Sequence, residues 1–170
     1  MNLNEVVEKV RDKKTVIMGI GNEENGDDAA GAFFAYLLEK KLREKNLNFD
    51  RLTVINAEKA PENFTGKIRK IKPEIVVLVD AAYLGKEKKV GEIEIFSFKQ
   101  GEKVENLLGG TFSTHAIPIS FLVDYLLSFV KEVSIIAIQV EKLDKFSNMS
   151  NEIIEKVHGL VDLIILGLGR

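Results

Sequence analysis

The run Ile-Val-Val-Leu-Val at 75–79 constrains the fold of this chain more than any other feature. It is continuously apolar and rich in β-branched side chains, and a strand of this kind is typical of a parallel sheet covered by helices on both faces. The runs at 15–19, 52–56 and 133–140 have a similar character. Because segments with helical spacing separate these runs, we predict one α/β domain that spans residues 1–170.

Shorter patterns predict the remaining elements. Residues 90–98 alternate between apolar and polar side chains, which indicates a half-exposed edge strand. The helix after Pro118 is expected to bury a stripe formed by Leu122, Tyr125, Leu126, Phe129 and Val130. The last helix is expected to bury Ile154, Val157, Val161, Ile164 and Ile165. His158 lies within that last stripe, and we expect it to serve in packing.

The order of the first three strands follows from their connections. Helical segments join the strands at 15–19, 52–56 and 75–80, and such crossovers between parallel strands are right-handed. If the third strand returns to the other side of the first, the order is 2-1-3. A crevice then opens between the first and third strands at their carboxyl ends, which is where α/β sheets bind ligands.

Composition excludes several classes of protein. The chain has a formal net charge of −2, so it offers no basic field for nucleic acid. It has no cysteine, which excludes disulfides, thiolate metal sites and a cysteine nucleophile. No apolar run reaches the roughly 18–20 residues of a membrane span, and the first residues lack the apolar core of a signal peptide. We therefore expect a cytoplasmic protein that binds neither nucleic acid nor membrane.

The stretch 19–31 joins the first strand to a helix through a glycine-containing loop. It begins Gly-Ile-Gly, as a dinucleotide-binding loop does, but Glu24 stands where that motif needs its third glycine. The carboxylates of Asp27 and Asp28 also suit a cation or a proton transfer better than a phosphate. The plain alternative is a strand-to-helix turn in which Asp27 caps the helix.

Three groups fall at one edge of the predicted sheet. Asp28 opens the helix after the first strand, Asp80 ends the third strand, and His115 precedes the helix that leads to the last strand. Two carboxylates and an imidazole can bind a divalent transition metal with positions open for a substrate. They can instead bind water and act as general acid and base. Each also has a structural interpretation. Asp28 can stabilise the helix as an acid in its first turn, where the helix dipole is positive. Asp80 can accept hydrogen bonds from loop amides, and His115 can be a helix cap or a partly buried, hydrogen-bonded histidine.

Five motifs occur in a characteristic order along the chain. They are Gly-Ile-Gly-Asn-x4-Asp-Asp-Ala-Ala-Gly at 19–31, Ala-Pro-Glu-Asn-Phe-Thr-Gly at 60–66, Val79-Asp80 with Gly91-Glu92 downstream, Ser-Thr-His-Ala-Ile-Pro at 113–118, and Ala-Ile-Gln at 137–139. In this order the chain resembles the hydrogenase maturation endopeptidases. The resemblance runs from about residue 15 to residue 140.

This resemblance implies an activity and a fold. Such enzymes remove a short C-terminal peptide from the large-subunit precursor of a nickel–iron hydrogenase after nickel has been inserted. The implied fold is a three-layer α/β/α sandwich of the phosphorylase/hydrolase-like kind. Its twisted five-stranded sheet is mostly parallel, with the order 2-1-3-5-4 and one antiparallel edge strand, in agreement with the pattern at 90–98. The expected partner is the precursor, and the expected state is a monomer.

The resemblance also implies roles for individual residues. The family's metal-contacting acid, second acid and histidine correspond to Asp28, Asp80 and His115. An aspartic-type peptidase is thus implied, in which Asp28 and Asp80 take part in catalysis and all three groups contact the metal. Nickel is then delivered within the substrate, and other divalent metals can replace it in vitro. The residues expected to contact the substrate are Gly21, Asn22, Asp27 and Thr114.

The chain departs from the family pattern at three places. The loop before the acid pair is Glu-Glu-Asn-Gly at 23–26, where apolar or small residues are common, and Ala116 and Val140 replace a common polar residue and a common proline. The alternative function is a non-proteolytic nickel-sensing or chaperone module for a hydrogenase subunit. A nucleotide-linked enzyme that uses the 19–26 loop is a third possibility. A serine hydrolase is disfavoured because no Gly-x-Ser-x-Gly motif occurs.

Overall fold

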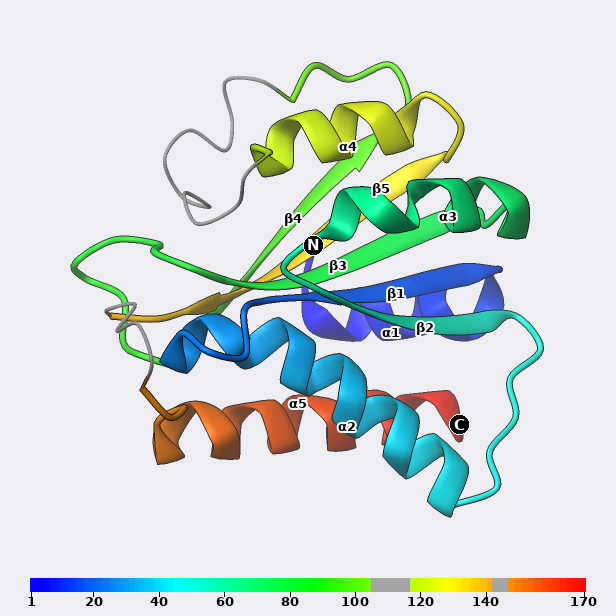
Figure 1. Cartoon of the computed structure of the whole chain (residues 1–170). Helices are drawn as coiled ribbons and strands as arrows, with labels where there is room; N and C mark the ends of the chain where they lie inside the picture. The colour runs from blue at the N-terminus through cyan, green and yellow to red at the C-terminus, as the bar shows by residue number, and fades with distance from the viewer. Residues whose placement is uncertain (105–116, 142–146) are drawn as a thin grey trace.

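The computed structural model describes residues 1–104, 117–141 and 147–170. Helices and strands alternate along the chain, except that the third and fourth strands follow each other with no helix between them (Figure 1). The described residues form the strands β1 Thr15–Ile20, β2 Leu52–Glu58, β3 Ile75–Ala82, β4 Ile93–Lys99 and β5 Glu132–Gln139. They form the helices α1 Leu3–Asp12, α2 Ala30–Glu44, α3 Thr65–Ile71, α4 Ile119–Leu127 and α5 Asn151–Leu168, and the 3-10 turns η1 Gly26–Ala29 and η2 Pro61–Phe64.

The strands form one sheet of order β2-β1-β3-β5-β4. β1 pairs in parallel with β2 and β3, and β3 pairs in parallel with β5. β4 lies antiparallel to β5 at the edge. The predicted order and the antiparallel edge strand are therefore confirmed. Because β1, β3 and β5 run the same way, their carboxyl ends lie at the same edge of the sheet (Figure 1).

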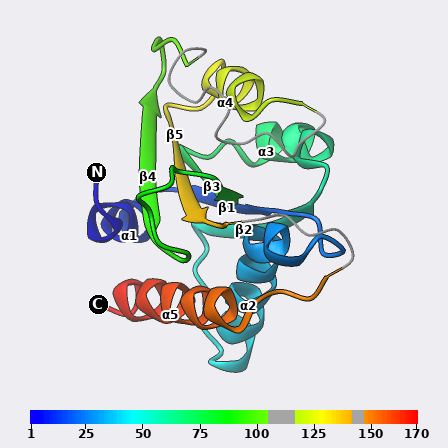
Figure 2. The ribbon, with the colours of Figure 1, turned by 90° about the vertical axis from the view of Figure 1, so that its left-hand side faces the viewer.

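Helices cover both faces of this sheet, so the molecule has three layers, as predicted (Figure 2). α1, α2 and α5 lie on one face, and α3 and α4 lie on the other. The side chains of β3 alternate between the two cores because successive strand residues point to opposite faces. Val77 and Val79 pack with the first group of helices, whereas Val76 and Leu78 pack with the second. Burial on both faces explains the continuous apolar run in this strand.

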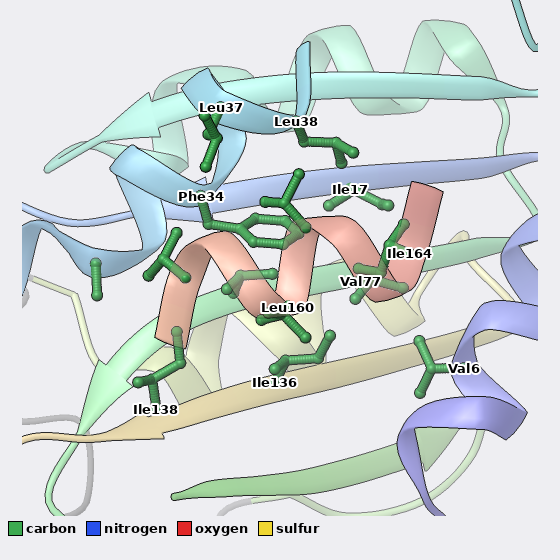
Figure 3. Close-up of a cluster of buried hydrophobic side chains, with 14 of the residues drawn as sticks. Val6, Ile17, Phe34, Leu37, Leu38, Val77, Ile136, Ile138, Leu160 and Ile164 are labelled. Atoms are coloured by element: carbon green, nitrogen blue, oxygen red, sulfur yellow. The ribbon is translucent and has the colours of Figure 1, made fainter. Parts of the chain in front are cut away.

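Phe34 of α2 is fully buried in the core beneath α1, α2 and α5. Figure 3 shows its ring in one cluster with Ile17 of β1, Val77 of β3 and Leu160 of α5. Burial of a Phe or Leu side chain stabilises the fold by about 1.5–3 kcal/mol. This core therefore fixes α2 on the sheet, and with it the loop that precedes the helix and carries Asp28.

α5 has 18 residues and packs against the same core through one face. Its predicted stripe is confirmed except at Ile154, which is half-buried, because Ile153 takes the fully buried position. The ring of His158 meets Phe33 edge to face with centroids 5.7 Å apart, so its expected packing role is confirmed. Within the described ranges, no helix has the length and apolar character needed to cross a membrane.

Two further expectations outside the site are wrong, and Phe129, which was expected in the buried stripe of α4, is only half-buried. Tyr125 of α4 is 47% exposed rather than buried. Its ring contacts Phe129 edge to face, and the guanidinium of Arg69 lies over both rings, at 5.6 Å and 4.2 Å from their centroids. A cation therefore covers this ring in place of the sheet. The edge strand begins at Ile93 rather than at 90, because Gly91 adopts a φ of 85° that a strand does not accommodate.

Candidate active site

The end of β1 departs from regular pairing just before the acid-containing loop. The register with β2 shifts between Gly19 and Ile20, so that Ile20 lies opposite Glu58. Glu58 has a φ of 51°, and its carbonyl oxygen accepts a hydrogen bond of 2.7 Å from the Gly21 N–H. Left-handed backbone is uncommon at residues other than glycine and clusters at functional sites. The irregularity therefore indicates this strand end as a candidate functional site.

The first turn of α2 approaches the strands so closely that only glycine fits at position 31. A Cβ on Gly31 would lie 2.1 Å from the carbonyl oxygen of Val79 in β3 and 2.2 Å from that of Ile20 in β1. Gly21 is constrained in the same way, since its Cβ would lie 2.2 Å from the carbonyl oxygen of Asp28. These approaches place the beginning of α2, and Asp28 just before it, against the ends of β1 and β3.

Asp28 lies in η1 and is only 3% exposed. Its Oδ2 accepts a hydrogen bond of 3.3 Å from the backbone N–H of Asn22. Asn22 also shapes the loop, because its Oδ1 accepts a hydrogen bond of 3.0 Å from the Glu24 N–H. The alternative in which Asp27 caps the helix is wrong: Asn25 is the N-cap of η1 and Ala29 is the N-cap of α2, and neither makes a side-chain cap hydrogen bond. The acid pair thus lies inside the turn.

Asp80 is fully buried and lies inside β3 rather than at its end. The strand continues to Ala82 because the small apolar residues after the acid maintain the pairing with β5. Val79, which precedes Asp80, is the residue whose carbonyl oxygen meets Gly31, and η1 packs against β3. Asp28 and Asp80 therefore lie at the same edge of the sheet, where the carboxyl ends of the parallel strands meet.

This pair of buried acids limits the chemistry that the edge can perform. A carboxylate is costly to bury unless it is hydrogen-bonded, paired or bound to a metal. Two carboxylates at one edge can contact a divalent cation, and either one can accept a proton from a bound water. The edge therefore suits metal contact and acid–base chemistry, the two alternatives that the sequence leaves open.

Two of the predicted site residues, Thr114 and His115, lie outside the described residues. α4 begins at Ile119 on the side of the molecule where β1, β3 and β5 end (Figure 1). Among residues 1–104, 117–141 and 147–170, no three His, Cys, Asp or Glu side chains come together in a way that could hold a metal ion. A complete metal site would therefore need a ligand beyond these residues, such as His115 or a group of the substrate.

Asp27, predicted to contact the substrate, is engaged by the segment before α5. Its Oδ1 accepts a hydrogen bond of 2.7 Å from the Ser150 N–H, and its Oδ2 accepts one of 3.0 Å from the Ser150 hydroxyl. The adjacent Gly26 N–H donates to the carbonyl oxygen of Ser147 at 3.0 Å. Sequence reasoning missed this contact. The signal that was present is a serine directly before the helix, which is typical of an N-cap.

Gln139 is a second residue whose structural role was not predicted from the sequence. It is 1% exposed at the end of β5. Its Oε1 accepts a hydrogen bond from the Leu84 N–H, and its Nε2 donates to the carbonyl oxygen of Gly85 at 3.4 Å. The amide therefore fixes the chain that leaves β3, a few residues after Asp80.

A small cavity opens beside the loop that leads to Asp28. It has a volume of about 130 Å³ and is lined by Gly21, Asn22, Glu23, Glu24, Glu58 and Lys59. Two of the residues predicted to contact the substrate, Gly21 and Asn22, thus border open space next to the acid edge. This space has room for a small group of a ligand.

Comparison with known proteins decides the family. The family model of the hydrogenase maturation proteases, HycI, matches residues 36–166. The chain belongs to the hydrogenase maturation proteases. A protein assigned as such a protease in Methanocaldococcus jannaschii is 36% identical over 156 residues, which are 90% of this chain and 87% of that protein. The hydrogenase 3 maturation protease of Escherichia coli is 30% identical over 142 residues, which are 84% of this chain and 83% of that protein.

The fold of these maturation proteases is the fold described above. The crystal structure of the [NiFe] hydrogenase maturation protease HycI from Thermococcus kodakarensis superposes with a TM-score of 0.80 at 30% identity, and the match covers 98% of this chain and 99% of that one. The predicted family, the predicted fold and the predicted function as a peptidase of hydrogenase maturation are therefore confirmed. The catalytic type, the metal and the roles of single residues stay predictions.

Proposed function

We propose that this maturation protease removes a short C-terminal peptide from the nickel-loaded large-subunit precursor of a nickel–iron hydrogenase. Membership of the family supports the substrate class. The observation that carries the proposal is the pair of buried acids, Asp28 and Asp80, at the edge where the parallel strands end. Ligands of open α/β sheets bind at this edge, so the scissile peptide is expected there.

In this proposal nickel is part of the substrate. It arrives already bound in the precursor, and Asp28, Asp80 and His115 complete its coordination. Carboxylate and imidazole ligands suit divalent transition metals, which supports this donor set. Because docking then requires the metal, the enzyme would cleave only a precursor that has received its nickel. Other divalent metals of similar coordination would substitute in vitro.

Hydrolysis in this proposal uses one of the two acids as a base. The carboxylate of Asp28 or Asp80 takes a proton from a water molecule, and the water oxygen attacks the peptide carbonyl carbon. The C–N bond then breaks, and the leaving amine receives a proton. Gly21 and Asn22 border the cavity beside Asp28 and, with Thr114, are available for contacts with the peptide. We also propose that the enzyme acts as a monomer in the cytoplasm.

The intact mass of a hydrogenase large-subunit precursor tests this function. The precursor is incubated with the enzyme after loading with nickel and, in parallel, without nickel. Loss of a C-terminal peptide only from the loaded form is expected. Cleavage regardless of nickel would contradict metal-gated docking, and a stable complex with unchanged mass would favour the non-proteolytic chaperone.

A further inference from the structure

Asp27 is the residue beside the site that the proposed reaction leaves without a role. It directly precedes Asp28 in η1, and its side chain is half-buried. Both of its carboxylate oxygens accept hydrogen bonds from Ser150, one from the backbone N–H and one from the hydroxyl. Ser150 is the N-cap of α5, and its hydroxyl oxygen also accepts a hydrogen bond from the Ile153 N–H.

The contact joins segments that are 123 residues apart in the sequence. A second hydrogen bond joins the same segments, because the backbone N–H of Gly26 donates to the carbonyl oxygen of Ser147. Two consecutive residues of the four-residue turn η1 are thus held to the segment that leads into α5. α5 is itself packed on the core below the sheet, so it gives the turn a rigid support (Figure 2).

The chemistry of this contact explains why an acid occupies position 27. A carboxylate accepts two hydrogen bonds at once, and such charge-assisted bonds are stronger than neutral ones. Its negative charge also lies at the positive end of the α5 dipole. A turn as short as η1 has few backbone hydrogen bonds of its own, so an external contact determines the direction in which the next side chain points.

We infer that Asp27 is a positioning residue, which fixes the carboxylate of Asp28 by holding η1 to Ser150. This inference rests on the proposed function, because it assigns Asp28 to the contact with the substrate metal. Asp27 would then act through Asp28 and would not contact the substrate itself. Residues that orient a metal-contacting group typically matter about 10- to 100-fold for metal affinity or activity.

The test compares Asp27→Ala with a control substitution in a different polar contact of α5. Asp162→Ala removes the ion pair of Asp162 with Lys41, which ties α5 to α2 and involves no residue of η1. Asp27→Asn keeps an acceptor for the Ser150 N–H, and Ser150→Thr keeps the hydroxyl, so both serve as conservative variants. KM and kcat are measured on nickel-loaded precursor, and the ¹H–¹⁵N resonance of Asn22 reports on its bond to Asp28.

For Asp27→Ala we expect kcat/KM to fall about 10- to 100-fold, mainly through KM, together with a shifted Asn22 resonance. Asp27→Asn and Ser150→Thr should retain most activity, and Asp162→Ala should match the wild type in both readouts. Equal kcat/KM and an unchanged Asn22 resonance in Asp27→Ala and Asp162→Ala would overturn the inference. If the wild type cleaves no precursor, the proposed function fails, while the resonance still decides whether Asp27 positions Asp28.

Discussion

The two ends of the sheet both bury acidic side chains, but in different surroundings. At the amino end of β5, Glu132 forms an ion pair with Lys9 of α1 and accepts a hydrogen bond of 3.0 Å from the Ser97 hydroxyl of β4. At the carboxyl end of the parallel strands, Asp28 and Asp80 are two buried carboxyl groups at one edge, and Asp28 accepts a hydrogen bond from the Asn22 N–H. The first arrangement joins an acid to a cation of the chain, whereas the second joins two acids at one edge, an arrangement that favours a bound cation or proton.

The pKa of Glu132 shows what the first arrangement does. Burial raises the pKa of this carboxyl, but the hydrogen bonds from Lys9 and Ser97 and the charge of Lys9 outweigh it, so that the pKa falls below its ordinary value of 4.5. Glu132 is therefore kept ionised and ties α1, β4 and β5 together. A buried acid alone therefore does not identify a functional site. The edge at which it lies and the close approach of α2 through Gly31 are what distinguish the active end.

The largest expected effect is on the cleavage rate, which should depend on the acids at the carboxyl end of the sheet and not on Glu132 at the amino end. Asp28→Asn and Asp80→Asn should each lower the cleavage rate of nickel-loaded precursor by about 10²–10⁴-fold, because an amide can neither act as the base nor contact the metal as a charged ligand. Glu132→Gln, the matched change at the other end, should leave the rate unchanged. Steady-state cleavage, followed by the mass of the product, measures all three. A fully active Asp28→Asn enzyme would remove this residue from the site.

The next effect is on stability and belongs to the amino end. Lys9→Met leaves Glu132 buried without its cation, which should cost about 3 kcal/mol, the lower end for a buried pair because Lys9 is partly exposed. Lys40→Met, which breaks the exposed pair with Glu44, should cost less than about 0.5 kcal/mol. Urea unfolding gives both values. Equal losses in the two variants would show that the Glu132 ion pair is not a stabilising feature of this end.

A glycine substitution tests the close packing at the carboxyl end. Gly31→Ala should lower the free energy of unfolding by about 1–3 kcal/mol, because its Cβ would overlap two backbone carbonyl oxygens that cannot easily move. Gly159→Ala in α5 is the control, since a Cβ there meets nothing within 4 Å. That change should stabilise the helix by about 0.5–1 kcal/mol. A Gly31→Ala variant as stable as the wild type would contradict the described approach of α2.

The smallest effect is a pH dependence. Because the folded-state pKa of Glu132 is lowered, the unfolded state binds more protons, and the contribution of this group is present above pH 4.5. It is lost as the pH falls from 4.5 through the folded-state pKa. The stability difference between wild type and Glu132→Gln should therefore shrink in acid, as urea unfolding at pH 7 and below pH 4.5 can measure. A difference independent of pH would contradict the assigned direction.

Most of the fold was predictable from the sequence. The apolar run at 75–79 predicts a central strand, and the alternation at 90–98 predicts an edge strand. A strand buried on both faces is continuously apolar, whereas a strand buried on one face alternates between apolar and polar residues. Local boundaries were less accessible. The end of β3 was misplaced at Asp80, since nothing in the pattern indicates that two alanines continue a ladder whose partner lies far away in the sequence.

The candidate site was predictable only in part. The position of Asp28 and Asp80 at the carboxyl edge of the sheet follows from the order of the strands, which the sequence pattern indicates. The contact between Asp27 and Ser150 joins the turn after β1 to the N-cap of α5, and no periodicity encodes such a long-range hydrogen bond. The exposed Tyr125 was misjudged for a similar reason, because its cover is Arg69 of another helix.

The affinity of the enzyme for its precursor tests the central claim most directly. Calorimetry would compare nickel-loaded and nickel-free precursor, first with the wild type and then with Asp28→Asn. If the acid edge contacts the nickel, the wild type should bind the loaded form at least about tenfold more tightly, since even weak coupling between two ligands is of that order. This preference should disappear in Asp28→Asn. A preference of the same size in the variant would contradict the account, because recognition of the metal would then lie elsewhere.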